Sequence, residues 1–126
     1  MKALLLLAVL ASGPALAYTG DELRGDCQAA DAQYRNELRD DPATTVRATR
    51  CLAYVAGFAD GYAVSRHLAD KVGVGLNAFC LPQDDNLPAR LVRAVLAHFE
   101  RLPPNSDSGT ATLVAGALSR AFPCPD

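Results

Sequence analysis

The sequence has no tryptophan, one methionine and only two histidines among its 126 residues. Its 12 lysines and arginines are balanced by 14 aspartates and glutamates, which gives a formal net charge of -2. A nucleic-acid-binding protein needs a basic patch that neutralises phosphates, so we exclude that class. With so few histidines and no recognisable catalytic motif, nothing supports an enzyme. We therefore expect one small non-enzymatic domain with no cofactor and no metal.

Long apolar runs are absent except at the start of the chain. Residues 1–17 open with Lys2, continue through an apolar stretch and a Gly-Pro break, and end in Ala15-Leu16-Ala17. This is the layout of a secretory signal peptide. The apolar stretch is about half of the roughly 20 residues that a membrane span needs, so we expect no membrane anchor after cleavage. The prediction is an exported protein, residues 18–126, cut after Ala17.

All four cysteines, Cys27, Cys51, Cys80 and Cys124, fall in the part predicted to be exported. An oxidising compartment favours disulfide bonds over free thiols. The alternatives are a metal site or a nucleophilic cysteine, but the chain has no Cys-x-x-Cys pair and no histidine close to a cysteine. We therefore expect two disulfide bonds.

Apolar residues recur at steps of three and four, which predicts amphipathic helices. The first begins at a Ser/Thr-x-x-Glu capping box, Thr19 to Glu22, and is expected to stop near Asp40. Asp41-Pro42 is a cap followed by a first-turn proline and starts the second helix. The predicted helices are about 19–40, 42–68, 88–102 and 109–122, so the fold class is an all-α, four-helix domain.

The spacing of the cysteines selects one pairing. Two residues of an antiparallel helical hairpin lie level when they are equidistant from the turn. The midpoint of Cys27 and Cys51 falls beside the Asp40-Asp41-Pro42 turn, and that of Cys80 and Cys124 falls beside Pro103-Pro104. We therefore predict Cys27–Cys51 and Cys80–Cys124, which staple two helical hairpins.

Two helices carry small or uncharged residues on the side away from the predicted core. In the second helix these residues are spaced by four: Ala53, Gly57, Gly61 and Ser65. Glycine in a helix interior costs about 1 kcal/mol relative to alanine, so something is expected to pack closely there. The fourth helix has Arg120 as its only charge, and we expect its two faces to be covered by the protein's own helices or by a second subunit.

Between the second and third helices, residues 70–86 are rich in Gly, Pro, Asn and Asp. This predicts a long loop, with a short helical or extended piece around residues 76–81. A loop of this length in a small domain is often functional, and irregular packing explains it equally well. The third helix carries Arg90, Arg93 and Arg101 outward, which suits either an acidic partner or a solvated face. His67 and His98 lack metal-ligand or catalytic neighbours.

The order of these motifs resembles a known family. The segments that carry the resemblance are Cys27, residues 51–60 (CLAYVAGFAD), residues 79–82 (FCLP), residues 113–118 (LVAGAL) and residues 122–124 (FPC). They are similar to the Rap/Tai family of periplasmic immunity proteins. These are exported helical proteins, associated with type VI secretion, that protect a bacterium from injected peptidoglycan amidases. The resemblance covers nearly all of the exported part.

The resemblance implies a homodimer that inserts a loop and a helix into the amidase cleft. This steric inhibition requires no reaction catalysed by the protein itself. The segment that we expect to enter the cleft consists of Lys71, Val72, Gly73, Val74, Gly75, Leu76 and Asn77. Two other functions stay open on the sequence alone. One is a periplasmic acid-stress chaperone, and the other is an orphan family member without an amidase partner.

Overall fold

The computed structural model describes residues 17–37, 41–103 and 108–126. Within these residues the chain forms four helices and no strand: α1 (Gly20–Tyr34), α2 (Pro42–Lys71), α3 (Leu87–Arg101) and α4 (Thr110–Ala121). The expected all-α, four-helix fold is therefore confirmed. The predicted signal peptide lies outside the described residues, apart from Ala17.

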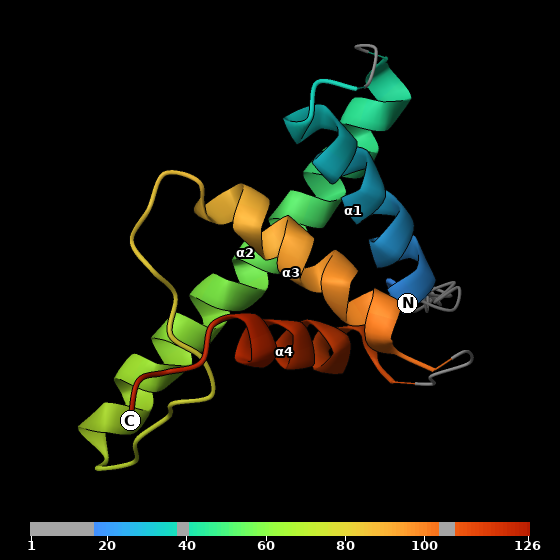
Figure 1. The fold of residues 1–126 in the computed structure, drawn as a ribbon. Coiled ribbons are helices and arrows are strands. Elements are labelled where there is room, and N and C mark those ends of the chain that lie inside the picture. Colours follow the sequence, from blue (N-terminus) through green and yellow to red (C-terminus); the bar gives the residue numbers. More distant parts are fainter. Residues whose placement is uncertain (1–16, 38–40, 104–107) are drawn as a thin grey trace, which may run out of the picture.

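The helices pack as two pairs around a shared core. α1 lies mainly against α2, while α3 contacts both α4 and α1. α2 is the longest helix and extends past the others toward the lower left of Figure 1. The C-terminal tail runs back along this extension, so the chain ends beside the second half of α2 (Figure 1). This arrangement leaves one end of α2 projecting from the body of the domain.

Both disulfide predictions are confirmed. Cys27 on α1 is bonded to Cys51 on α2, with Cα atoms 5.0 Å apart, and both residues are fully buried. Cys80, in the loop before α3, is bonded to Cys124 in the C-terminal tail, with Cα atoms 4.8 Å apart. The first bond therefore staples α1 to α2 in the core, and the second fastens the long loop to the tail.

The predicted helix starts are also confirmed. The Thr19 side chain accepts a hydrogen bond from the Glu22 amide at 3.2 Å, and the Glu22 carboxylate accepts one from the Thr19 amide at 2.8 Å. This reciprocal capping box satisfies two amides that the helix itself leaves unpaired. At the start of α2, the Asp41 carboxylate accepts from the Thr44 amide at 3.0 Å.

The predicted end of the first helix is wrong. α1 stops at Tyr34, about six residues before Asp40, because Asn36 adopts a positive φ of 56°. The Asn36 amide donates to the Gln33 carbonyl and the Glu37 amide donates to the Ala32 carbonyl, both at 3.0 Å. These two bonds form a Schellman motif, which closes a helix with a left-handed residue. Tyr34, the last residue of α1, is 41% exposed.

The core is built from small and aliphatic side chains on all four helices. Its largest fully enclosed side chains are Leu23, Cys27, Cys51, Val55, Val92, Val95, Val114 and Leu118. Burial of apolar surface contributes about 25 cal/mol per Å², so these side chains stabilise the contacts between the two helix pairs. Most of this set comes from α2, α3 and α4.

The segment before α3 differs from the prediction in one respect. Residues 76–81 form neither a helix nor a strand. They are held by other contacts, since the Cys80 amide donates to the Phe122 carbonyl at 2.8 Å and the Phe79 ring stacks on Tyr62 with centroids 4.1 Å apart. At the start of α4, Gly109 is the N-cap and makes no side-chain capping bond.

None of the helices in the described part of the chain has the length and the hydrophobicity needed to cross a bilayer.

Candidate interaction surface

Exposed hydrophobic side chains concentrate on one helix and the turn that follows it. The large hydrophobic residues that are more than 40% exposed in the described chain are Tyr34, Val46, Val64, Leu68, Val72 and Val74. All of them except Tyr34 belong to α2 or to the three residues that follow it. Exposed apolar residues that gather on one element mark an interaction surface more often than scattered ones do.

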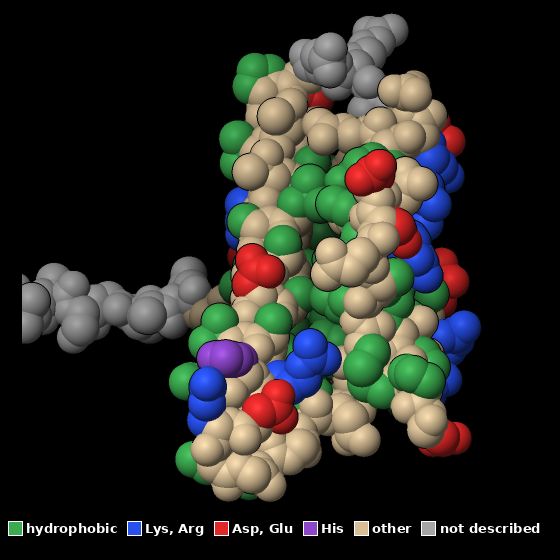
Figure 2. Space-filling view, turned by 90° about the vertical axis from the view of Figure 1, so that its left-hand side faces the viewer, with side chains coloured by type: hydrophobic (Ala, Val, Ile, Leu, Met, Phe, Trp, Pro, Cys, Tyr) green, Lys and Arg blue, Asp and Glu red, His purple; other side chains and the backbone are tan. Residues whose placement is uncertain are grey.

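α2 is apolar on both of its sides. Its inner side packs in the core through Ala48, Cys51, Val55 and Ala59. On the opposite side, helical spacing aligns a second row, which we call the α2 outer face: Val46, Ala53, Gly57, Gly61, Val64 and Leu68. In Figure 2, hydrophobic side chains lie exposed at intervals along the left-hand edge of the molecule, where α2 runs.

No other part of the described chain packs on the α2 outer face. A Cβ atom added at Gly57 or at Gly61 would meet no atom within 4 Å. The expectation that something packs on the small-residue row is therefore wrong for the single described chain. Similarly, Ala111 and Thr112 on α4 are exposed, so its second face is only partly covered. The central residues of the α2 outer face remain available to a second molecule.

The segment predicted to enter the amidase cleft, Lys71–Asn77, lies at the projecting end of α2, and we call it the end loop. The Gly73 amide donates to the Asp70 carbonyl at 3.2 Å and the Val74 amide donates to the Ala69 carbonyl at 2.9 Å. With Gly73 at a φ of 78°, these bonds form a second Schellman motif. The helix therefore runs three residues beyond the predicted Leu68 and turns sharply at a glycine.

The end loop is exposed but anchored. Val72 is 76% exposed and Val74 is 51% exposed, and within the loop only Leu76 is half-buried. Directly after the loop, the Ala78 amide donates to the Tyr62 hydroxyl oxygen at 2.7 Å, and Phe79 is buried. The structure thus holds both ends of a short apolar segment that protrudes from the domain (Figure 1).

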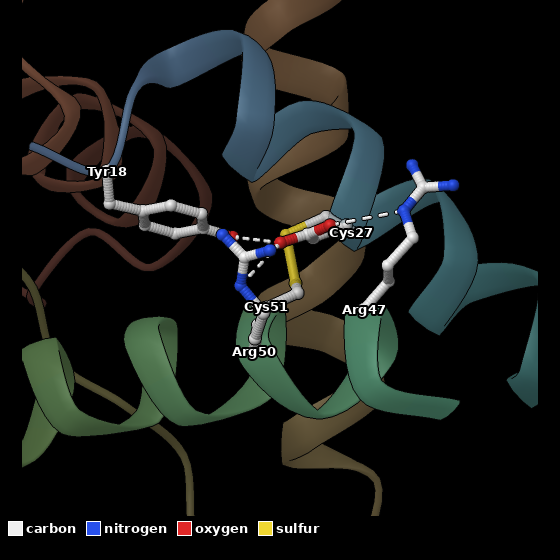
Figure 3. The surroundings of a disulfide bond; sticks show 6 residues. Tyr18, Cys27, Arg47, Arg50 and Cys51 are labelled. Carbon is white, nitrogen blue, oxygen red and sulfur yellow. Dashed lines mark hydrogen bonds and ion pairs between the residues drawn. A yellow bond between two sulfur atoms is a disulfide. The ribbon is translucent and has the colours of Figure 1, made fainter. Parts of the chain in front are cut away.

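A polar cluster beside the Cys27–Cys51 bond went unnoticed in the sequence. Asp26 is 4% exposed, and its carboxylate accepts a hydrogen bond from the Tyr18 hydroxyl at 2.7 Å. Arg47 lies 3.2 Å and Arg50 3.4 Å from the same carboxylate (Figure 3). Two features of the sequence could have predicted this cluster. Asp26 is next to the inward-facing Cys27, and Arg47 and Arg50 lie three residues apart on the facing helix.

The contacts of this cluster indicate a structural role. Burial, together with the hydrogen bond to Asp26, raises the pKa of the Tyr18 hydroxyl far above its ordinary value, so Tyr18 keeps its proton at physiological pH. The guanidinium of Arg50 also lies over the Tyr18 ring, 5.0 Å from its centroid. A protonated tyrosine and a carboxylate that already has three partners offer neither a nucleophile nor a base. The cluster ties residue 18 to α1 and α2.

The three arginines expected to face outward on α3 do so, but two of them have partners within the chain. Arg90 pairs with Asp84 and lies over the Phe122 ring, and Arg93 is 3.5 Å from Asp31. Arg101 has no ion pair among the described residues. The structure therefore does not support an acidic partner bound by all three arginines together.

Comparison with known proteins identifies the family. A family model that describes Rap1a immunity proteins matches residues 19–124. No curated protein and no solved structure matches the chain. The match begins at the N-cap of α1 and ends at the cysteine that closes the second disulfide bond, so it includes all four helices and both disulfides. The chain therefore belongs to the family of Rap1a immunity proteins.

Proposed function

We propose that this protein is exported to the periplasm, where it binds a type VI secretion peptidoglycan amidase and blocks its cleft. The observation that carries the proposal is the family match over residues 19–124. Immunity proteins neutralise an effector by binding it, and that role requires no catalytic group in this chain. The Cys27–Cys51 and Cys80–Cys124 bonds suit an oxidising compartment, which supports export through the signal peptide expected at residues 1–17.

The end loop is the segment that we propose enters the amidase cleft. It supports this role in three ways: it protrudes, it exposes Val72 and Val74, and it is fastened by the Schellman motif on one side and by Tyr62 on the other. A loop that is already held in shape loses less conformational freedom on binding. Steric exclusion of the cell-wall substrate then needs only that the loop fill the cleft.

We further propose that the α2 outer face joins two copies into a homodimer. Most of its residues are symmetric about Gly57: Ala53 and Gly61 lie four residues to either side, and Val46 and Leu68 lie eleven residues to either side. Two copies of α2 crossing antiparallel at Gly57 would therefore set Ala53 against Gly61 and Val46 against Leu68, as a two-fold interface requires, while Val64 would lie opposite Arg50. The glycines allow the two helix backbones to approach closely.

The size of this face suits a weak dimer. From Val46 to Leu68 it covers 23 residues, or about 35 Å of helix, so a face about 10 Å wide offers about 350 Å² per copy. The total of about 700 Å² is below the lower bound of about 1,000 Å² for stable specific interfaces. An antiparallel crossing would also bring the end loop of each copy near the first turn of its partner's α2.

The test is to mix the purified, oxidised protein, residues 18–126, with a panel of type VI peptidoglycan amidases, including any encoded beside its gene. Cell-wall hydrolysis and complex formation are measured in the same samples. Stoichiometric inhibition of one amidase supports the proposal and names the partner. Absence of binding to every amidase, by a protein shown to be folded and disulfide-bonded, contradicts it and favours an orphan family member.

A further inference from the structure

A hollow of about 440 Å³ lies between the second halves of α3 and α4. Its apolar lining consists of alanines from both helices: Ala94, Ala97, Ala117 and Ala121. Its remaining lining residues are His98 and Arg101 from α3 and Arg120 from α4. Small side chains on both helices keep the hollow open, and every polar side chain in its lining is basic.

The two arginines of the hollow lack partners of opposite charge. Arg90 and Arg93 on α3 each pair with an aspartate, whereas neither Arg101 nor Arg120 forms an ion pair in the parts of the chain that the structure describes. A cation near a helix C-terminus is stabilised by the helix dipole, which explains each arginine taken singly. It does not explain why two guanidinium groups from different helices line one hollow.

His98 belongs to the same site and is held there by packing. Its Nδ1 atom is buried and has no hydrogen-bond partner. Its Nε2 atom packs closely on Gly116, because a Cβ atom added at Gly116 would be only 3.0 Å from it, closer than most Cβ contacts. Glycine at position 116 therefore makes room for the imidazole ring, although glycine costs a helix about 1 kcal/mol relative to alanine.

We propose that the hollow is a binding site for an oxyanion, either a phosphate or a carboxylate group, held between Arg101 and Arg120. Guanidinium groups bind both kinds of anion through paired hydrogen bonds, and the alanine lining reduces competition from water. The site lies between α3 and α4, away from the end loop and the α2 outer face, so it is independent of the function proposed above.

His98 provides a built-in reporter for the bound anion. Burial lowers the pKa of the His98 imidazole, and the charges of Arg120 on α4 and Arg101 on α3 lower it further. A negative charge between the two arginines opposes their effect on the ring. Binding of an anion must therefore raise the pKa of His98, whereas His67, exposed on α2, is the internal reference.

The experiment is an NMR titration of the two histidines in the oxidised protein, at constant ionic strength, with sodium chloride replaced by sodium sulfate. Sulfate keeps its double charge over the whole pH range of the titration and is the probe for a phosphate group. Acetate, added at one fixed pH, is the probe for a carboxylate group. We expect sulfate to raise the pKa of His98 by about 0.5 to 1 pH unit, saturably, and to leave His67 unchanged.

Matched variants locate the effect. Arg101→Gln and Arg120→Gln are each expected to abolish most of the sulfate response, and Arg66→Gln, at an exposed position on α2, is expected to keep it. All three positions are exposed, so the variants are expected to fold, which circular dichroism checks. The proposal is overturned if sulfate shifts both histidines equally, if it shifts neither, or if the Arg101→Gln and Arg120→Gln variants respond like the unmodified protein.

Discussion

The Ala78 amide donates a hydrogen bond to the Tyr62 hydroxyl oxygen across 2.7 Å, joining the chain just after the end loop to the second half of α2. The Tyr62 ring also stacks on Phe79, with centroids 4.1 Å apart. One tyrosine thus fixes the point where the exposed end loop stops and the anchored part of the segment before α3 begins.

Tyr62→Phe tests this anchor. The variant keeps the ring that packs on Phe79 but removes the oxygen that accepts a hydrogen bond from the Ala78 amide. The free energy of unfolding should therefore fall by about 0.5 to 1.5 kcal/mol. Hydrogen exchange at Ala78 should accelerate, while exchange in α1 stays unchanged. Equal acceleration in α1 would mean that Tyr62 supports the whole domain and is no specific anchor of the loop.

Substitutions at Gly57 distinguish the stability of the single chain from its association into a dimer. In the single chain, a Cβ atom at this position meets nothing within 4 Å, so Gly57→Ala should stabilise α2 by up to about 1 kcal/mol. Gly57→Arg should leave the monomer folded and abolish the proposed dimer. Sedimentation velocity measures the association and chemical denaturation the stability. A Gly57→Arg protein that remains dimeric would exclude the antiparallel crossing at Gly57.

Tyr18 predicts how stability responds to alkaline pH. Because folding raises the pKa of its hydroxyl above the unfolded value of about 10, the folded chain holds this proton more tightly than the unfolded chain. The resulting stabilisation is fully present below pH 10 and is lost as the pH rises from there toward the folded pKa. Tyr18→Phe should remove this contribution to the alkaline decline, which denaturation at pH 9, 10 and 11 measures.

The same substitution carries a cost at neutral pH. Tyr18→Phe deletes the hydrogen bond to the buried Asp26 carboxylate, so the free energy of unfolding at pH 7 should fall by about 1 to 2 kcal/mol. Tyr54→Phe is the matched control, since the Tyr54 ring contacts Tyr18 and no hydrogen bond of its hydroxyl is found in the described structure. Equal losses in the two variants would contradict a special role for the Asp26 bond.

The Cys80–Cys124 bond is expected to stabilise the chain chiefly by restricting its unfolded state. With the two cysteines separated by 44 positions in the sequence, the chain-entropy relation gives about 4 kcal/mol for its removal. The double variant Cys80→Ala, Cys124→Ala should therefore unfold at lower denaturant but keep its helical content, because this bond lies outside the four helices. Loss of helix signal under native conditions would show that the bond is required for folding.

Local sequence signals predicted much of the fold. Thr19 with Glu22 and Asp41 with Pro42 mark helix starts because a cap needs only a few neighbouring residues. The disulfide pairing also followed from spacing, since the two halves of a helical hairpin are level at equal distances from their turn. The prediction placed the end of α1 too late because nothing around Asn36 except the residue type itself indicates a left-handed cap. Asparagine tolerates that conformation.

Local sequence signals could not predict contacts between residues that are distant in the sequence. The Asp26 cluster joins Tyr18, Arg47 and Arg50 from separate segments, and the approach of His98 to Gly116 depends on how α3 crosses α4. The small-residue row on α2 was noticed, but which surface covers it depends on tertiary and quaternary packing. The sequence therefore located the end loop and both disulfides, and it left the hollow between α3 and α4 unseen.

The most direct test of the account is the inhibition constant of the end-loop variant Val72→Asp, Val74→Asp against the amidase that the unmodified protein inhibits. Val72 and Val74 are exposed, so two carboxylates there should spare the fold and weaken inhibition at least tenfold, about 1.4 kcal/mol. Tyr34→Asp, at an exposed hydrophobic position on α1, is the control and should inhibit like the unmodified protein. If the end-loop variant inhibits as strongly as the unmodified protein, the end loop is not the segment that blocks the effector.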